Sequence, residues 1–155
     1  MPARPTNIQV LPGKRLYAKA VLIDTGALLA LADSKDIHHL SASDCLKSIA
    51  EHRLPVFISI PTIYESQRRI LFDLGQQVAT QFLDQIYDGS LNIERTVNED
   101  EQEARALIKK YTALKLTLTD AANMAVMMRL GIAMVFSFDR HFLQAGFIRI
   151  PPFYL

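Results

Sequence analysis

The sequence has one cysteine, Cys45, no tryptophan and no long hydrophobic run among its 155 residues. A single cysteine excludes an internal disulfide and any cysteine-based zinc site. No apolar run reaches the roughly 18 residues that span a bilayer. The first residues contain no apolar stretch after a charged segment, so they do not resemble a signal peptide. We therefore expect a soluble, cytoplasmic, single-domain protein with no membrane segment.

Net charge is also small, at +1, but it is unevenly distributed along the chain. Residues 1–20 contain four basic side chains and no acid, which leaves the rest of the chain with a net charge of −3. We predict a basic N-terminal extension over residues 1–19 and one folded domain over residues 20–155. A basic arm can contact phosphate or a protein partner, but a solvated extension is the simpler interpretation.

Short apolar segments alternate with segments that have apolar residues at helical spacing. The apolar segments predict strands at 20–23, 56–58, 91–93, 132–136 and 147–150. The first of them is apolar without alternation, as in a parallel strand that is buried on both faces. Strands that alternate with helices predict an α/β fold, a three-layer α/β/α sandwich around a central, mostly parallel sheet.

Polar residues at the expected helix starts suggest the caps. We predict Ser41 or Ser43 as the cap of a helix that ends near His52, Thr62-x-x-Glu65 and Asn98-x-x-Glu101 as capping boxes, and Thr119 as the cap of a buried helix that ends at Gly131. The acids that follow Asn98 are interpreted as complements to the helix dipole. The adjacent His38 and His39 are interpreted as surface residues, because neighbouring positions on a helix face different ways.

Four acids stand at element boundaries beside buried sequence. They are Asp24, Glu65, Asp120 and Asp139. The first and last of them follow predicted strands, and in open α/β sheets ligands bind at the carboxyl ends of the strands. Because clustered carboxylates repel each other, such a cluster normally holds a hard cation.

Each acid also has a purely structural interpretation. Asp24 and Asp139 can serve turns after their strands, Glu65 can serve the predicted capping box, and Asp120 can complement a helix dipole. Turn chemistry after Asp24 is already supplied by the next two residues, and the neighbours of Asp139, Arg140 and His141, suit a phosphate site. We therefore favour the functional interpretation for all four acids.

Four stretches in the same order resemble the PIN-domain ribonucleases, a family that includes VapC-type toxins. The stretches are Val21-Leu22-Ile23-Asp24-Thr25-Gly26-Ala27-Leu28, Pro61-Thr62-Ile63-Tyr64-Glu65, Leu116-Thr117-Leu118-Thr119-Asp120-Ala121-Ala122 and Val135-Phe136-Ser137-Phe138-Asp139-Arg140-His141-Phe142. The likeness covers almost all of residues 20–150, and residues 1–19 fall outside it. One departure is Asn123, one turn after Asp120, near a position where the family often has a further acid.

The resemblance implies a PIN-like fold and a metal-dependent endoribonuclease that uses Mg²⁺ or Mn²⁺ and leaves 5′-phosphate and 3′-hydroxyl ends. Such ions take oxygen ligands and activate water for phosphodiester hydrolysis. The implied metal-binding and catalytic residues are Asp24, Glu65, Asp120 and Asp139, the implied hydrogen-bond donors to these carboxylates are Thr25 and Ser137, and the candidate substrate contacts are Arg68, Arg69, Arg140 and His141. Asn123 implies weaker metal binding on its side of the site.

The resemblance also implies partners: RNA as substrate, an antitoxin protein that fills the acidic groove, and a second copy of the chain in a homodimer. Three rival functions share some of the same residues. Asp24-Thr25-Gly26 matches retroviral-type aspartic proteases, but those folds are almost all β. A haloacid-dehalogenase-like phosphatase expects a second acid where Gly26 stands. The third rival is a catalytically degenerate PIN domain that binds RNA or protein without cutting.

Overall fold

A computed structural model describes residues 17–152 of the chain. The predicted basic extension, residues 1–19, therefore lies largely outside the described residues. At the boundary, the ring of Tyr17 packs edge-on against Phe57 of the core, with 5.0 Å between ring centroids. Among residues 17–152, no helix is both long and apolar enough to cross a membrane.

Five parallel strands form one central sheet in the order β3-β2-β1-β4-β5. In chain order the strands are β1 (Val21–Ile23), β2 (Val56–Ser59), β3 (Asn92–Glu94), β4 (Met134–Phe136) and β5 (Ile148–Ile150). All five predicted strands are present, each within two residues of the expected bounds. β1 is at the centre and buried on both faces, as its unbroken apolar run predicted.

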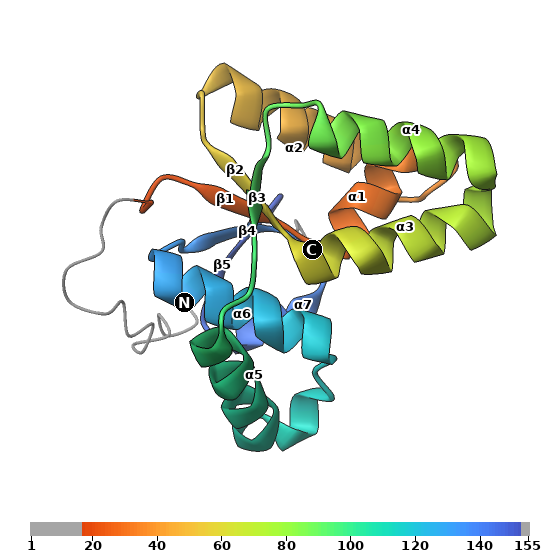
Figure 1. The fold of residues 1–155 in the computed structure, drawn as a ribbon. Coiled ribbons are helices and arrows are strands. Elements are labelled where there is room, and N and C mark those ends of the chain that lie inside the picture. The colour runs from red at the N-terminus through yellow and green to blue at the C-terminus, as the bar shows by residue number, and fades with distance from the viewer. Residues whose placement is uncertain (1–16, 153–155) are drawn as a thin grey trace.

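Helices cover both faces of the sheet, so the predicted three-layer α/β/α sandwich is confirmed (Figure 1). One layer contains α1 (Thr25–Ala32), α2 (His39–Glu51), α3 (Ile60–Leu74) and α4 (Gln76–Tyr87). The other contains α5 (Asn98–Lys110), the short 3₁₀ helix Thr112–Leu114, α6 (Leu118–Leu130) and α7 (Arg140–Gln144). A separate hydrophobic core fills the space on each side of the sheet.

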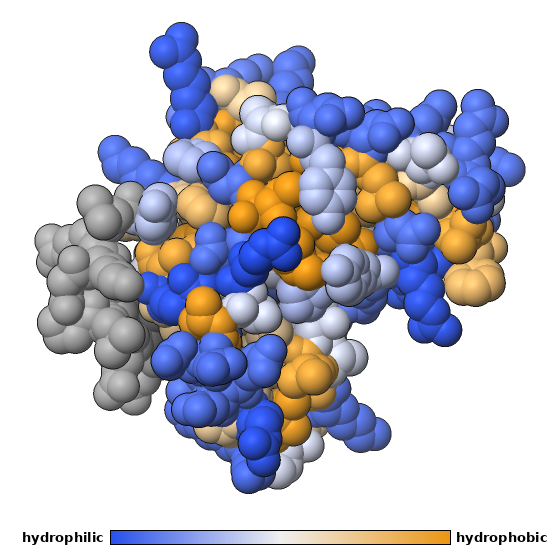
Figure 2. Space-filling view, in the orientation of Figure 1, coloured by the Kyte–Doolittle hydropathy of each residue, from blue (hydrophilic) through white to orange (hydrophobic). Residues whose placement is uncertain are grey.

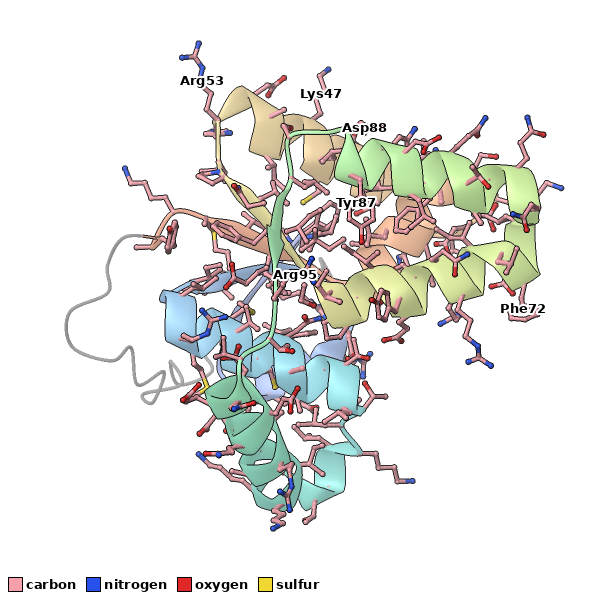
Figure 3. The ribbon with its side chains drawn as sticks, in the orientation of Figure 1. Lys47, Arg53, Phe72, Tyr87, Asp88 and Arg95 are labelled. Atoms are coloured by element: carbon pink, nitrogen blue, oxygen red, sulfur yellow. The ribbon has the colours of Figure 1, made fainter. Side chains whose placement is uncertain are left out.

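The α3–α4 pair forms a hairpin that extends to one side of the sheet (Figure 1). Its tip is Gly75, whose φ of 94° favours glycine. Figure 2 shows hydrophobic surface at this outer end. Phe72 lies there, 76% exposed, and Figure 3 shows its side chain pointing away from the body of the protein.

Four of the predicted helix caps are wrong by a few residues. α2 begins at His39, and the Ser43 hydroxyl donates to the His39 carbonyl instead of capping the helix. α3 is capped by Ser59, which accepts a hydrogen bond from the Thr62 amide. The Thr62–Glu65 capping box is therefore absent. At α5, the residue that reaches back to the start of the helix is Asp100 rather than Glu101. The correction at α6 is given with the site below.

Asp100 also differs from the other acids at the start of α5, because it is buried and paired. Arg129 of α6 donates to both of its carboxylate oxygens, from Nε at 2.9 and 3.1 Å and from an Nη at 3.0 Å. The same Nη donates to Glu94 of β3 at 2.8 Å. This network joins a strand and two helices of one layer, so Asp100 has a structural role beyond the helix dipole.

Candidate active site

All four predicted acids line one pocket at the carboxyl edge of the sheet. The pocket measures about 370 Å³ and is lined by Asp24, Thr25, Gly26, Glu65, Arg69, Thr117, Asp120, Phe138, Asp139 and His141. Two of the acids meet because β1 and β4 are neighbours in parallel register, with Ile23 opposite Phe136. Asp24 follows β1 as the N-cap of α1, and Asp139 follows β4 as the N-cap of α7. The other two acids come from helices on opposite faces, Glu65 from α3 and Asp120 from α6.

Ser137 links the two strand-end acids. Its hydroxyl donates to Asp24 Oδ2 at 2.9 Å and accepts the backbone N–H of Asp139, also at 2.9 Å. The Asp24 amide in turn donates to the Phe136 carbonyl. The Thr25 hydroxyl is buried and forms no hydrogen bond within the described residues, so it does not hold a carboxylate here as the resemblance implied.

Asp24 is a buried acid of the pocket with a strongly raised pKa. The residue is only 4% exposed. Burial, helped by the nearby charge of Asp120, raises its pKa from 3.8 to about 7, although the hydrogen bond from Ser137 works in the opposite direction. An ionised Asp24 therefore needs a positive charge close by. Strongly shifted carboxyl groups inside a pocket are common at functional sites.

Asp120 has both a structural and a site role. The cap of α6 is Thr117, not Thr119: its hydroxyl accepts the Asp120 amide at 3.1 Å, and Asp120 Oδ2 accepts the Thr117 amide at 3.2 Å. This capping box fixes the side chain of Asp120 at the helix start. Because the same carboxylate raises the pKa of Asp24, the cap also sets the charge distribution of the pocket.

His141 stands between the acids of α6 and α7. Its backbone N–H donates to Asp139 Oδ1 at 2.8 Å. Its ring Nδ1 lies 3.2 Å from that oxygen and 3.6 Å from Asp120 Oδ2. Ligand atoms of these three residues all lie within 4.8 Å of one another, close enough to share a metal ion.

Of the three arginines predicted as substrate contacts, one lines the pocket and two lie outside it. Arg69 lines the pocket, where it also approaches Asp73 one turn along α3, at 4.0 Å. Arg68 lies on another side of the helix, with its guanidinium 5.8 Å from the centre of the Phe72 ring. Arg140 is exposed and is not among the pocket-lining residues.

Three further residues near the site have contacts that the sequence did not predict. The side chain of Asn123 is fully buried and hydrogen-bonded to Ser59 and to the Thr62 hydroxyl, so it fastens α6 to α3 and does not face the pocket. His38 is partly exposed, and its ring stacks on Phe138 with 4.3 Å between centroids. Phe138 itself lines the pocket, and its position next to Asp139 was the only sequence signal for it.

The donor set fits a hard divalent cation. Four carboxylates line the pocket, and Asp120, Asp139 and His141 bring ligand atoms within 4.8 Å of one another. Among the residues that line the pocket, the positive side chains are Arg69 and, when protonated, His141. Mg²⁺ and Mn²⁺ prefer such ligands, and Mg²⁺ sites typically use only a few carboxylates together with water. In parallel α/β sandwiches ligands bind at the carboxyl ends of the strands, so this acidic pocket is the candidate ligand site of the fold.

The family is established by comparison with known proteins. The sequence model of the PIN domain family matches residues 21–148, so the chain belongs to the PIN domain family. This match begins at β1, ends at β5 and includes all four acids of the pocket. The resemblance seen in the sequence is confirmed.

Individual relatives are distant in sequence. The chain is 23% identical over 125 residues to Ribonuclease VapC26 of Mycobacterium tuberculosis, which covers 81% of this chain and 90% of that protein. Its fold is similar to the crystal structure of VapC20 from M. tuberculosis, a sarcin-ricin loop cleaving toxin, with a TM-score of 0.77 and 23% identity over 86% of this chain and 100% of that one. It is also similar to VapBC2 from Rickettsia felis bound to promoter DNA, with a TM-score of 0.61 and 13% identity over 84% of this chain and 96% of that one.

Proposed function

We propose that this chain is a metal-dependent endoribonuclease that hydrolyses RNA phosphodiester bonds, and that it is the toxin of a toxin–antitoxin pair. The observation that carries the proposal is the convergence of Asp24, Glu65, Asp120 and Asp139 in one pocket. The ribonuclease activity is supported by the likeness to Ribonuclease VapC26 and to the sarcin-ricin loop cleaving toxin VapC20.

In this proposal Asp24, Asp120 and Asp139 hold Mg²⁺ or Mn²⁺. The bound ion supplies a counter-charge for the phosphate oxygens and makes water more acidic. Glu65 faces the same pocket from α3 and orients the attacking water together with Asp120. Ser137 keeps Asp24 and Asp139 in fixed relation through its two hydrogen bonds, so that both carboxylates are placed before substrate arrives.

Basic side chains position the RNA. Arg69 lies in the pocket and is the residue that we assign to the phosphate at the cleaved bond. Arg68 and Arg140 lie outside the pocket, and we assign them to the backbone on either side of it. Contacts of this kind carry no sequence information, so they leave the choice of RNA to other parts of the surface.

The proposed protein partners are an antitoxin, which covers the acidic pocket, and a second copy of this chain. The antitoxin is supported by the similarity to VapBC structures, including one bound to DNA of their promoter. A homodimer is supported by the large apolar side chains exposed on α3, Tyr64 and Phe72.

The test is cleavage of a mixed-sequence RNA by wild type, Asp24→Asn and Glu65→Gln, with Mg²⁺ or Mn²⁺ and with chelator. We expect cation-dependent cleavage that falls by about 10²–10³-fold or more in each variant, since each loses a charge that acts on the reacting groups. Asp88→Asn, at the exposed end of α4 (Figure 3), is the matched control and should cleave normally.

The alternative is the catalytically degenerate PIN domain, which binds RNA or protein without cutting. Folded wild-type protein that neither cleaves RNA nor binds a divalent cation would favour it. Cleavage that persists unchanged in Asp24→Asn would contradict the role of the pocket.

A further inference from the structure

We propose that His141 is a nitrogen ligand of the cation in this pocket and that it makes the site prefer Mn²⁺ over Mg²⁺. The inference rests on the proposed metal site and adds a residue and a selectivity to it. Of the chain's four histidines, His141 is the one that lines the pocket. The His141 side chain is partly exposed, but its Nδ1 atom is buried. This atom forms no hydrogen bond with any of the described residues.

The backbone holds the ring in place for this role. Asp139 caps α7 by accepting the N–H of His141 at 2.8 Å, and this fixes the first turn of the helix beside the pocket. The ring then turns back toward the carboxylates, so Nδ1 approaches Asp139 Oδ1 and Asp120 Oδ2 together. One short turn thus presents an oxygen ligand and a nitrogen ligand to the same point.

The spacing of these atoms matches that of ligands around one ion. Bond lengths of about 2.1 Å place neighbouring ligands of an octahedral ion about 3 Å apart. Nδ1 lies 3.2 and 3.6 Å from the two carboxylate oxygens. A cation can therefore enter among the three groups with only small side-chain adjustments.

The chemistry of the nitrogen ligand sets the expected selectivity. Mg²⁺ takes oxygen ligands and gives up water reluctantly, whereas imidazole suits transition-metal ions. A site with carboxylates alone discriminates weakly between Mg²⁺ and Mn²⁺. Adding an imidazole favours Mn²⁺, because this first-row transition-metal ion gains more from a nitrogen donor than Mg²⁺ does.

A competing explanation makes the opposite prediction. A protonated His141 ring beside two carboxylates would serve as their counter-charge and would have to be displaced when a cation binds. Removing the ring would then tighten the binding of both ions. If His141 is instead a ligand, removing its ring weakens the binding of the cation, and it weakens the binding of Mn²⁺ more than that of Mg²⁺.

The experiment is calorimetric titration of the metal-free, full-length protein with Mn²⁺ and with Mg²⁺, for wild type and His141→Ala. We expect the variant to lose about 10-fold or more in Mn²⁺ affinity and less than about threefold in Mg²⁺ affinity, the size of loss typical when a metal-site partner is removed. His52→Ala is the matched control, because that ring lies on the exposed end of α2 and bonds the Ser48 carbonyl. Urea unfolding of each variant checks that the fold is intact.

A spectroscopic readout tests ligation independently of affinity. Electron spin-echo spectra of bound Mn²⁺ should show ¹⁴N coupling in wild type and His52→Ala and none in His141→Ala. Binding of both ions without ¹⁴N coupling, or tighter binding of both in His141→Ala, would overturn the ligand assignment and leave the metal site of the proposed function standing. Wild type that binds neither ion would overturn both.

Discussion

Two buried aspartates of this protein have opposite surroundings. Asp100 is 2% exposed and meets the guanidinium of Arg129 through three hydrogen bonds. Asp24 is 4% exposed, and its neighbours are the Ser137 hydroxyl and two further carboxylates, of Asp120 and Asp139. Burial is therefore the same at both positions, and the difference lies in the charge that faces each carboxylate.

The difference separates a structural carboxylate from a functional one. A buried charge is tolerated when it is paired, and the chain supplies the partner of Asp100 itself. At Asp24 the surrounding acids raise the pKa of the carboxyl group, so the folded protein keeps an electrostatic cost that an added cation relieves. We interpret the Arg129 network as a structural ion pair. We interpret the acidic pocket as a site that a bound cation completes.

The largest expected effect comes from breaking the structural pair. Arg129→Met leaves Asp100 buried without its cation, and we expect it to lower the free energy of unfolding by about 3–5 kcal/mol. Urea unfolding followed by circular dichroism measures the loss. The matched control is Arg69→Met, whose ion pair with Asp73 is 4.0 Å long and more than half exposed on both sides, and which should cost at most about 1 kcal/mol. A loss below 1 kcal/mol in Arg129→Met would remove the contrast between the two aspartates.

The second prediction concerns how the free energy of unfolding depends on pH through Asp24, the buried aspartate that lacks a cationic partner among the described residues. Because its pKa rises from 3.8 to about 7 on folding, the folded state holds the proton more tightly than the unfolded state does. This contribution to stability is complete below about pH 4 and disappears as the pH rises through 7. In chelator, the free energy of unfolding of wild type should therefore fall between pH 5 and 7, relative to Asp24→Asn, by at most about 1.4 kcal/mol per pH unit.

Unfolding curves in urea at several pH values, for wild type and Asp24→Asn, provide the measurement. Asn cannot titrate, so the variant removes this slope and keeps the shape of the side chain. Asp88→Asn is again the surface control, and its pH profile should follow that of wild type. Parallel profiles for wild type and Asp24→Asn would show that Asp24 is ionised at the same pH in both states.

Much of this structure could be predicted from short-range patterns. Short apolar segments predicted the strands, and the unbroken apolar run of β1 also predicted its burial, since a strand buried on both faces needs apolar residues at every position. The ends of β1 and β4 then placed Asp24 and Asp139 at one edge. Contacts between distant positions left no such pattern. Nothing in the sequence pairs Arg129 with Asp100, which is 29 residues away, or aims the His141 ring at Asp120.

The caps of α3 and α6 were mispredicted for a different reason. Any Ser, Thr, Asn or Asp near a helix start is a competent cap, so the sequence leaves several equivalent choices within one turn. At α3 the tertiary structure decides: Ser59 ends β2, caps the helix and also donates to Asn123 of α6. Thr62 was the competing candidate, but it is buried inside the first turn and takes part in this cluster instead.

The smallest effect follows from that cap and separates Glu65 from the fold. Because Glu65 closes no capping box and its neutralisation removes one charge from an acidic pocket, Glu65→Gln should lower the free energy of unfolding by no more than about 0.5 kcal/mol. Ser59→Ala, which removes the actual cap and a buried hydrogen bond, should cost about 1–2 kcal/mol in the same urea experiment. Equal losses in the two variants would restore a capping role to Glu65. An unchanged stability would mean that any loss of RNA cleavage in Glu65→Gln arises in the pocket and not from the helix.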